Sequence, residues 1–267
     1  MTLRIGISPC PNDTFTFAAL LERRVSGPDF DFVLEDVETL NESMLAGDLD
    51  VAKVSFHAAL RAEADYVVLP VGAAVGRGSG PLLLSAPSAN GRDHPKPGDI
   101  VLAPGRLTTA TLLYRLFYRD GPEPDHVVFS EIMPALERGD ADFGVVIHEG
   151  RFTYSDYEGL GRVADLGELW EADTDAPLPL GGIVARRTLG VAVHDEVTAA
   201  IRRSLSEARR DPDATLPVMQ AHAQEHSEEV LRRHVELWVT EATERLGSEE
   251  HRALRLLAQR ARAAGLT

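Results

Sequence analysis

Short apolar runs alternate with amphipathic stretches through the first two thirds of the chain. Runs of branched and aromatic residues bounded by turn residues are typical of strands, whereas apolar positions three and four apart are typical of helices. Strands are predicted at residues 3–7, 30–34, 51–54, 66–70, 81–86, 100–103, 127–129, 143–147 and 180–185, with helices between most of them. This alternation predicts an α/β fold.

Beyond Val191 the pattern changes to successive helical stretches. Residues 197–205 and 230–238 each place apolar groups at helical spacing beside a charged face. We expect these C-terminal helices to cover the first lobe of the fold.

A repeated pattern indicates two similar lobes. Residues 45–52 (LAGDLDVA) and 136–144 (LERGDADFG) each read as a helix end with a glycine stop followed by an apolar strand. Thr39 and Glu42 form a candidate capping box before the first copy, and Ser130 is a candidate cap before the second. The chain therefore reads as two βαβαβ lobes, although a chance recurrence of common helix–strand junctions would give the same pattern.

The boundaries of these lobes follow from composition. Residues 85–98 are polar and rich in proline, and residues 180–185 read as a strand returning to the first lobe. We predict a larger lobe of residues 1–98 and 179–267 that carries the C-terminal helices, and a smaller lobe of residues 99–178. The glycine-rich stretch 72–80 is too irregular for a nucleotide fingerprint and is interpreted as a flexible connection that lines a central cleft.

Charge and composition exclude several classes of protein. The 267 residues carry 27 Lys and Arg against 42 Asp and Glu, a formal net charge of −15, which argues against nucleic acid as a partner. The one cysteine cannot form an internal disulfide. No signal sequence and no apolar stretch of about 20 residues is found. We expect a cytoplasmic protein with no membrane contact, and the sequence leaves its oligomeric state open.

A rigid polar turn follows the first strand, where residues 8–15 read SPCPNDTF. The prolines fix the backbone, and Asn12, Asp13 and Thr14 are residue types that cap helices. In α/β sheets, ligands bind beyond the carboxyl ends of strands, where helix N-termini favour anions. The turn therefore predicts an anion-binding rim, and an ordinary capped loop is the alternative.

Two side chains near strand ends are candidates for chemistry. Lys53 lies in an otherwise apolar strand and suits a point contact to an anion, unless it only extends from the strand end to solvent. His148 follows the apolar strand 143–147 and can exchange a proton near neutral pH, unless it is a structural histidine. His222 and His226 share a helix face, but no partner pattern completes a metal site, so these two, His234 and His251 are interpreted as surface histidines.

Five segments of the chain carry a resemblance to a known family. They are residues 8–15 (SPCPNDTF), 35–41 (EDVETLN), 76–82 (GRGSGPL), 147–154 (IHEGRFTY) and 177–181 (PLPLG). Together they resemble the 1,4-dihydroxy-6-naphthoate synthases of the futalosine route to menaquinone. The resemblance covers nearly the whole chain in order. It implies a two-lobed fold like that of type II periplasmic binding proteins, with a central cleft. It also implies a carbon–carbon lyase that converts cyclic dehypoxanthine futalosine to 1,4-dihydroxy-6-naphthoate without a metal or organic cofactor.

The resemblance further assigns roles to individual residues. His148 corresponds to the proton acceptor. The substrate-binding stretches that the resemblance implies are Lys53, Val54 and Ser55 together with Thr108, Thr109 and Ala110. Asn12, Asn41 and Arg77, which lie in the matching segments, are predicted as further contacts to a small carboxylate. Leu107 stands where a polar residue is expected before the paired threonines. Chorismate dehydratase of the same pathway and a non-catalytic solute-binding protein remain alternatives, and the segments around residues 8–15 and His148 favour the synthase.

Overall fold

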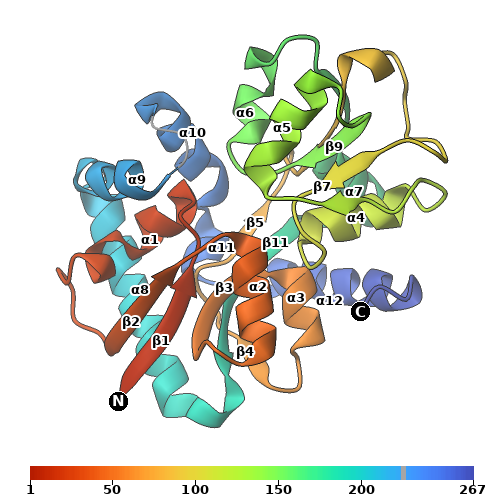
Figure 1. Ribbon diagram of the computed structural model, residues 1–267. Helices are drawn as coiled ribbons and strands as arrows, with labels where there is room; N and C mark the ends of the chain where they lie inside the picture. Colours follow the sequence, from red (N-terminus) through yellow and green to blue (C-terminus); the bar gives the residue numbers. More distant parts are fainter. Residues whose placement is uncertain (224–226) are drawn as a thin grey trace. The chain divides into compact units, whose positions relative to one another are not determined.

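The computed structural model describes residues 1–223 and 227–267 (Figure 1). The chain divides into two compact units, which are described separately here. Unit 1 comprises residues 1–75 and 179–251, and unit 2 comprises residues 76–178 and 252–267. Among the described residues, no helix combines the length and the apolar character that crossing a membrane requires.

Unit 1 is a sheet flanked by helices. Its elements in chain order are β1 (Thr2–Ile7), α1 (Pro11–Leu21), β2 (Asp29–Leu34), α2 (Val37–Ala46), β3 (Val51–Ser55), α3 (Phe56–Arg61), β4 (Tyr66–Val68), β5 (Ala74–Gly76), β11 (Leu178–Arg186), α8 (Val191–Arg210), α9 (Leu216–His222), α10 (Glu228–Trp238) and α11 (Glu241–Glu244). The main path of the sheet has the order β2-β1-β3-β11-β4. β1 is parallel to both of its neighbours, and β11 is antiparallel to β3 and β4.

Unit 2 contains a second sheet with its own helices. Its elements are β6 (Leu82–Ser85), β7 (Val101–Ala103), α4 (Thr109–Phe117), β8 (Asp125–His126), α5 (Phe129–Arg138), β9 (Phe143–Val146), α6 (Gly150–Thr153), β10 (Gly161–Asp165) and α7 (Leu166–Thr174), with α12 (Ser248–Ala263) beginning in unit 1 and ending in unit 2. The order of the sheet is β10-β6-β9-β7-β8, with β7 parallel to its neighbours and β6 antiparallel to its own.

The two sheets have the same plan. Read from one edge, β2-β1-β3-β11-β4 matches β8-β7-β9-β6-β10 strand for strand, including the antiparallel strand in fourth place. The glycine stops of the sequence repeat are equivalent as well, because Gly47 ends α2 and Gly139 ends α5 with φ of 81° and 76°. These left-handed conformations favour glycine. The prediction of two similar lobes is confirmed.

Each unit has its own apolar core. In unit 1, Leu3 and Ile5 of β1 pack with Phe17 of α1 and Ile201 of α8, and Figure 1 shows α1 lying beside α8. In unit 2, residues from β6, β9 and α5 form the corresponding cluster. Gly144 of β9 lets α5 approach closely, because a Cβ there would lie 2.5 Å from Cγ2 of Ile132. In unit 1, Val197, Ala200 and Ile201 of α8 lie in this core, as the helical spacing of apolar groups in residues 197–205 predicts.

Eight of the nine predicted strands are present with ends within two residues of the predicted ones, and the exception is residues 127–129. Phe129 begins α5, and the strand at this place is β8, two residues earlier. The predicted caps are also wrong. Asp36, not Thr39, caps α2 through a bond from the Glu38 amide, and α5 has Val128 at its N-cap with no side-chain bond, so Ser130 lies inside the helix.

The unit boundaries differ from the predicted lobes at two places. The junction at residues 178 and 179 is the same, but the first junction lies at residues 75 and 76, because β6 pairs with β9 and β10. Residues 252–267 group with unit 2, where Arg260 forms an ion pair with Asp173 at 2.7 Å. The C-terminal helices therefore do not all belong to the first lobe.

Candidate active site

The turn after β1 opens helix α1. The helix begins at Pro11, and the carbonyl of Cys10 accepts hydrogen bonds from the amides of Asp13 and Thr14 at 3.0 Å each. Proline suits the first helical position because the amide that it lacks would have no partner within the helix. The prediction that Asn12, Asp13 or Thr14 caps the helix is wrong, since all three lie within its first turn.

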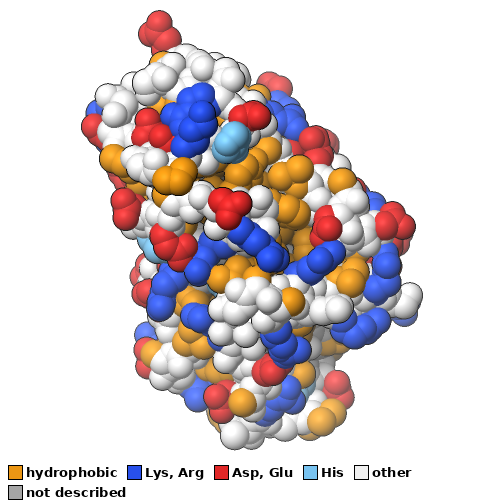
Figure 2. Space-filling view, turned by 90° about the vertical axis from the view of Figure 1, so that its right-hand side faces the viewer, with side chains coloured by type: hydrophobic (Ala, Val, Ile, Leu, Met, Phe, Trp, Pro, Cys, Tyr) orange, Lys and Arg blue, Asp and Glu red, His pale blue; other side chains and the backbone are white. Residues whose placement is uncertain are grey.

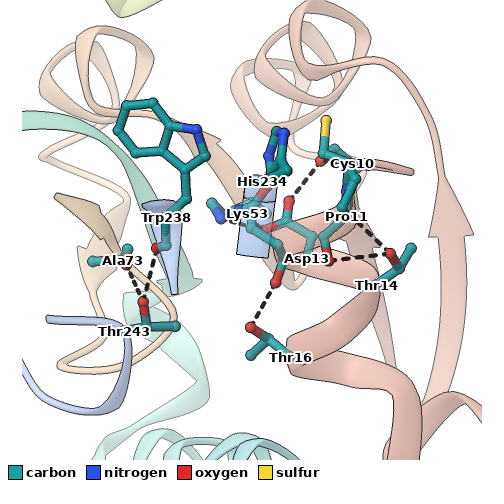
Figure 3. A network of polar contacts seen from close by, with 12 residues as sticks. Cys10, Pro11, Asp13, Thr14, Thr16, Lys53, Ala73, His234, Trp238 and Thr243 are labelled. Carbon is teal, nitrogen blue, oxygen red and sulfur yellow. Dashed lines mark hydrogen bonds and ion pairs between the residues drawn. The ribbon is translucent and has the colours of Figure 1, made fainter. Parts of the chain in front are cut away.

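The carboxylate of Asp13 is the centre of a buried polar cluster in unit 1 (Figure 3). It accepts hydrogen bonds from the Ser8 hydroxyl at 2.6 Å and from the Asn12 amide nitrogen at 2.9 Å, and it forms an ion pair with the Lys53 ammonium. The Asp13 and Lys53 side chains are 4% and 8% exposed. Charges buried to this degree require a partner, so each of these two groups depends on the other.

Lys53 has hydrogen-bonding capacity beyond this ion pair. An ammonium has three N–H donors, and within residues 1–223 and 227–267 Asp13 is the one group that pairs with it. Gly181 on the adjacent β11 lets the two strands approach closely, because a Cβ there would lie 2.7 Å from the Val54 carbonyl oxygen. A compact cation with donors to spare can bind an anionic group.

The end of β3 is fixed by α2. Lys53 and Ser55 lie two residues apart and project from one face of the strand, whereas Val54 projects from the other. Asn41 of α2 is fully buried. Its side-chain oxygen accepts a bond from the Ser55 amide at 2.9 Å, and its nitrogen donates to Ser55 Oγ at 3.3 Å and to Glu38 at 3.1 Å. Asn41 therefore holds Ser55 in place.

In unit 2, a threonine caps α4. Thr108 Oγ1 accepts a bond from the Thr111 amide at 3.1 Å, and the Thr111 hydroxyl donates to the Gly105 carbonyl at 2.6 Å. Gly105 has a φ of 132°, a backbone conformation that residues other than glycine rarely adopt. Thr109 and Ala110 are the first two helical residues, and both are buried. The predicted helix start at Thr108 and Thr109 is confirmed, and it presents the positive end of the helix dipole.

His148 follows β9 in a strained conformation. Its φ is 55°, in the left-handed region that few residues other than glycine occupy. Its ring is half-buried and meets the ring of Phe129 edge to face, with 4.9 Å between centroids and 68° between planes. Strained residues of this kind concentrate at functional sites, because the surrounding structure must hold them in place.

The chain after His148 is anchored within unit 2. Arg151 donates to the Gly80 carbonyl at 2.9 Å and forms an ion pair with Asp165, whose buried carboxylate caps α7. A Cβ on Gly80 would lie 2.4 Å from the Gly167 amide nitrogen, and the Gly78 amide donates to Glu171 at 2.6 Å. Residues 78–80 of the glycine-rich stretch are therefore packed against α7, and the interpretation of the stretch as a flexible connection stays a prediction.

The remaining predicted residues fall in different surroundings. Arg77 is 44% exposed and lies 3.9 Å from the Glu171 carboxylate. Figure 2 shows a face with many Lys and Arg side chains although the net charge of the chain is −15, so the overall charge does not describe every surface. Within unit 1 the structure brings Asn12 and Lys53 to one carboxylate, and it joins Asn41 to Ser55.

The histidines divide into buried and exposed ones. His222 and His251 are exposed, as predicted, and His226 lies outside the described residues. The prediction is wrong for His234, which is 1% exposed and lies 3.0 Å from Asn12 through its Nε2. No group of three or more His, Cys, Asp or Glu side chains suited to a metal ion occurs in the part of the chain that the structure describes.

Sequence reasoning missed three members of the Asp13 cluster: Ser8, Asp13 itself as an ion-pair partner, and His234. One signal was present for His234, because it stands on the apolar stripe of α10 with Leu231 and Trp238, where a polar residue needs a buried partner. No comparable signal linked Asp13 to Lys53, which lies 40 residues away in the sequence.

Comparisons with known proteins agree with this architecture. Two bacterial proteins named 1,4-dihydroxy-6-naphthoate synthase are similar over 99% of this chain. The one from Streptomyces coelicolor is 44% identical with 94% of its length covered, and the one from Thermus thermophilus is 45% identical with 95% covered.

Solved structures also match. A crystal structure of a protein from Archaeoglobus fulgidus has a TM-score of 0.93 at 33% identity and covers 100% of this chain and 98% of its own. The alkanesulfonate-binding protein of Xanthomonas axonopodis, bound to MOPS, has a TM-score of 0.70 at 16% identity, with 99% and 93% covered. The predicted fold of type II periplasmic binding proteins is confirmed. A family profile described as menaquinone biosynthesis matches residues 3–263, and the chain therefore belongs to this family.

Proposed function

We propose that this protein is a 1,4-dihydroxy-6-naphthoate synthase, which cleaves cyclic dehypoxanthine futalosine in menaquinone biosynthesis. The observation that carries the proposal is the identity of 44% and 45% to two proteins of that name over nearly their whole lengths. Membership of a biosynthetic family also supports a cytoplasmic location, which cell fractionation tests.

We propose that the protein is a carbon–carbon lyase with His148 as its general base. The neutral imidazole takes a proton from a substrate hydroxyl, and the oxygen of that hydroxyl becomes the carbonyl oxygen of the departing three-carbon fragment as the carbon–carbon bond breaks. The electrons of the broken bond form an enolate on the ring. Hydrogen-bond donors stabilise that enolate, and aromatisation then makes the step irreversible. The strained backbone of His148 and its contact with Phe129 support this role, because they fix the direction of the ring.

Each unit has its own set of proposed substrate-binding residues. In unit 1, Lys53 contacts an anionic group of the substrate, and Asn12, Asn41, Ser55 and Val54 form its surroundings. The buried ammonium with one carboxylate partner supports this assignment. In unit 2, the substrate-binding stretch is the first turn of α4, supported by the helix dipole. The corresponding residues are Thr108, Thr109 and Ala110. Arg77 remains a candidate contact.

Incubation of the purified protein with cyclic dehypoxanthine futalosine tests the reaction, with naphthoate formation followed by absorbance and mass spectrometry. We expect turnover without added metal or cofactor. Dehydration of chorismate in a parallel incubation would instead indicate chorismate dehydratase. Binding of the futalosine without turnover would indicate a solute-binding protein. Either of these outcomes would contradict the proposal.

The role of His148 is tested with His148→Asn. Asparagine retains a hydrogen bond but cannot accept the proton, so we expect kcat to fall by about 10²–10⁴ with little change in substrate affinity. His126→Asn is the matched control, because His126 is an exposed histidine of the same unit. A near-normal rate with a lowered melting temperature would show that His148 has a structural role only.

A further inference from the structure

His234 lies at the end of a chain of hydrogen bonds that leads to Lys53. It is a residue of α10, 1% exposed, and its ring lies by the start of α1 (Figure 3). Its Nε2 lies 3.0 Å from Oδ1 of Asn12, and Nδ2 of Asn12 donates to Oδ1 of Asp13 at 2.9 Å. The carboxylate of Asp13 in turn pairs with Lys53. Residues 12–13, 53 and 234, which are far apart in the sequence, are thus linked by this chain of contacts.

The ionised carboxylate sets the direction of every bond in this chain. It can only accept, so the Asn12 amide must present its nitrogen to Asp13. The amide oxygen of Asn12 therefore faces His234, and Nε2 of His234 must carry a proton and donate it. The proton on Nε2 of His234 matches this orientation of the amide and holds it. In the other orientation, the amide oxygen would face the carboxylate and repel it.

We propose that His234 is a positioning residue for Lys53, acting through Asn12 and Asp13. By holding the Asn12 amide, it fixes the Asp13 carboxylate and thereby the place of the Lys53 ammonium. The inference rests on the proposed function in one respect, namely that Lys53 contacts an anionic group of the substrate. It predicts that a change at His234 alters the affinity for anionic ligands more than the affinity for neutral ligands of the same shape.

A simple ligand pair isolates this effect from catalysis. We choose 2-naphthoate and its uncharged amide, 2-naphthamide, with binding measured by calorimetry. The variants are His234→Leu, which removes the donor, and His234→Gln, which retains one. His222→Leu is the control, because His222 is an exposed histidine of unit 1. Melting temperatures are measured for every variant.

We expect His234→Leu to lower the affinity for 2-naphthoate by about tenfold or more, because the variant loses a hydrogen bond within a charged network. Binding of 2-naphthamide should change by less than about twofold, and His234→Gln should recover part of the affinity. With cyclic dehypoxanthine futalosine as the substrate, KM should rise by a larger factor than kcat falls. The effect of His234→Leu should disappear in an Asn12→Ala background, because the amide that links His234 to Asp13 is then absent.

Several results would overturn the inference. The first is an equal loss of affinity for 2-naphthoate and 2-naphthamide in His234→Leu. The second is that the effect of His234→Leu persists in the Asn12→Ala background. The third is that the wild-type protein binds the two ligands with equal affinity. If His234→Leu does not fold, nitrogen NMR of the wild-type imidazole decides, because a proton on Nδ1 alone contradicts the bond direction. Naphthoate binding that depends on His234 in a protein that does not cleave the futalosine would leave the inference intact and overturn only the proposed function.

Discussion

Breaking the ion pair between Asp13 and Lys53 should reveal how strongly the two charges depend on each other. The change Lys53→Met removes the cation and preserves most of the side-chain volume. Since the partner carboxylate is 4% exposed, it is left as a buried charge that keeps its hydrogen bonds from Ser8 and Asn12. Removal of one partner of a buried pair lowers the free energy of unfolding by about 3–5 kcal/mol, and the two remaining donors place this case near the lower end.

The double variant supplies the decisive comparison. Lys53→Met combined with Asp13→Asn leaves neither charge of the pair. The decrease in the free energy of unfolding of this double variant should therefore be smaller, by at least about 2 kcal/mol, than the sum of the decreases in the two single variants. Arg232→Met is the control in the same unit, because the Arg232 and Asp213 side chains are 37% and 84% exposed and their ion pair should contribute little to the free energy of unfolding.

Fluorescence can follow unit 1 by itself in this experiment. The chain has two tryptophans, Trp170 in α7 of unit 2 and Trp238 in α10 of unit 1. In a Trp170→Phe background, urea unfolding monitored at Trp238 reports the unit that contains the ion pair. If the decreases in the free energy of unfolding of the two single variants add up to that of the double variant within about 0.5 kcal/mol, the reasoning is refuted, because independent groups behave in that way.

Three further changes test other parts of the structure. Thr108→Val should weaken 2-naphthoate binding and lower the melting temperature because it removes the cap on the Thr111 amide, whereas Thr108→Ser should preserve both, and equal effects of the two variants would contradict this. Cys10→Ser should change kcat by less than about tenfold, because we expect the thiol to pack rather than to act as a nucleophile, and a loss of several orders of magnitude in a folded variant would be evidence against that. Burial raises the pKa of Asp36 above its ordinary value of 3.8, against the lowering effect of the Glu38 amide, so its contribution to stability is largest at low pH and is lost as the pH rises through the folded-state pKa. At pH 7, the free energy of unfolding of Asp36→Asn, measured in urea, should therefore be at least as high as that of the wild type. As the pH falls towards 4, the stability of the variant should decrease relative to the wild type, and a less stable variant at pH 7 would argue against this.

The sequence predicts the elements of the fold because each depends on nearby residues. Apolar periodicity locates most strands, and the glycines at residues 47 and 139 mark two helix ends. The errors arise where several residues compete for one role. Asp36 and Thr39 are both suitable caps, and proline at residue 11 moves the start of α1 ahead of the polar residues.

The polar cluster was less accessible to sequence reasoning. Lys53 was recognised as an unusual residue of its strand, but its partner was not, because the contact depends on how α1 and β3 pack. The bond between His234 and Asn12 joins residues 222 positions apart, and no local pattern encodes it. The left-handed backbone of His148 is equally hidden, since histidine at a strand end does not require it.

The place of β11 has a consequence for synthesis of the protein on the ribosome. In unit 1, β11 lies between β3 and β4, and its residues follow every strand of the unit 2 sheet in the chain. The sheet of unit 2 can thus assemble while the N-terminal sheet still lacks its fourth strand. During that interval the nascent chain carries an unpaired edge on β3, which is prone to wrong pairing. Slow translation before residue 178 would lengthen this exposure, and a truncated chain that ends there should bind chaperones or aggregate.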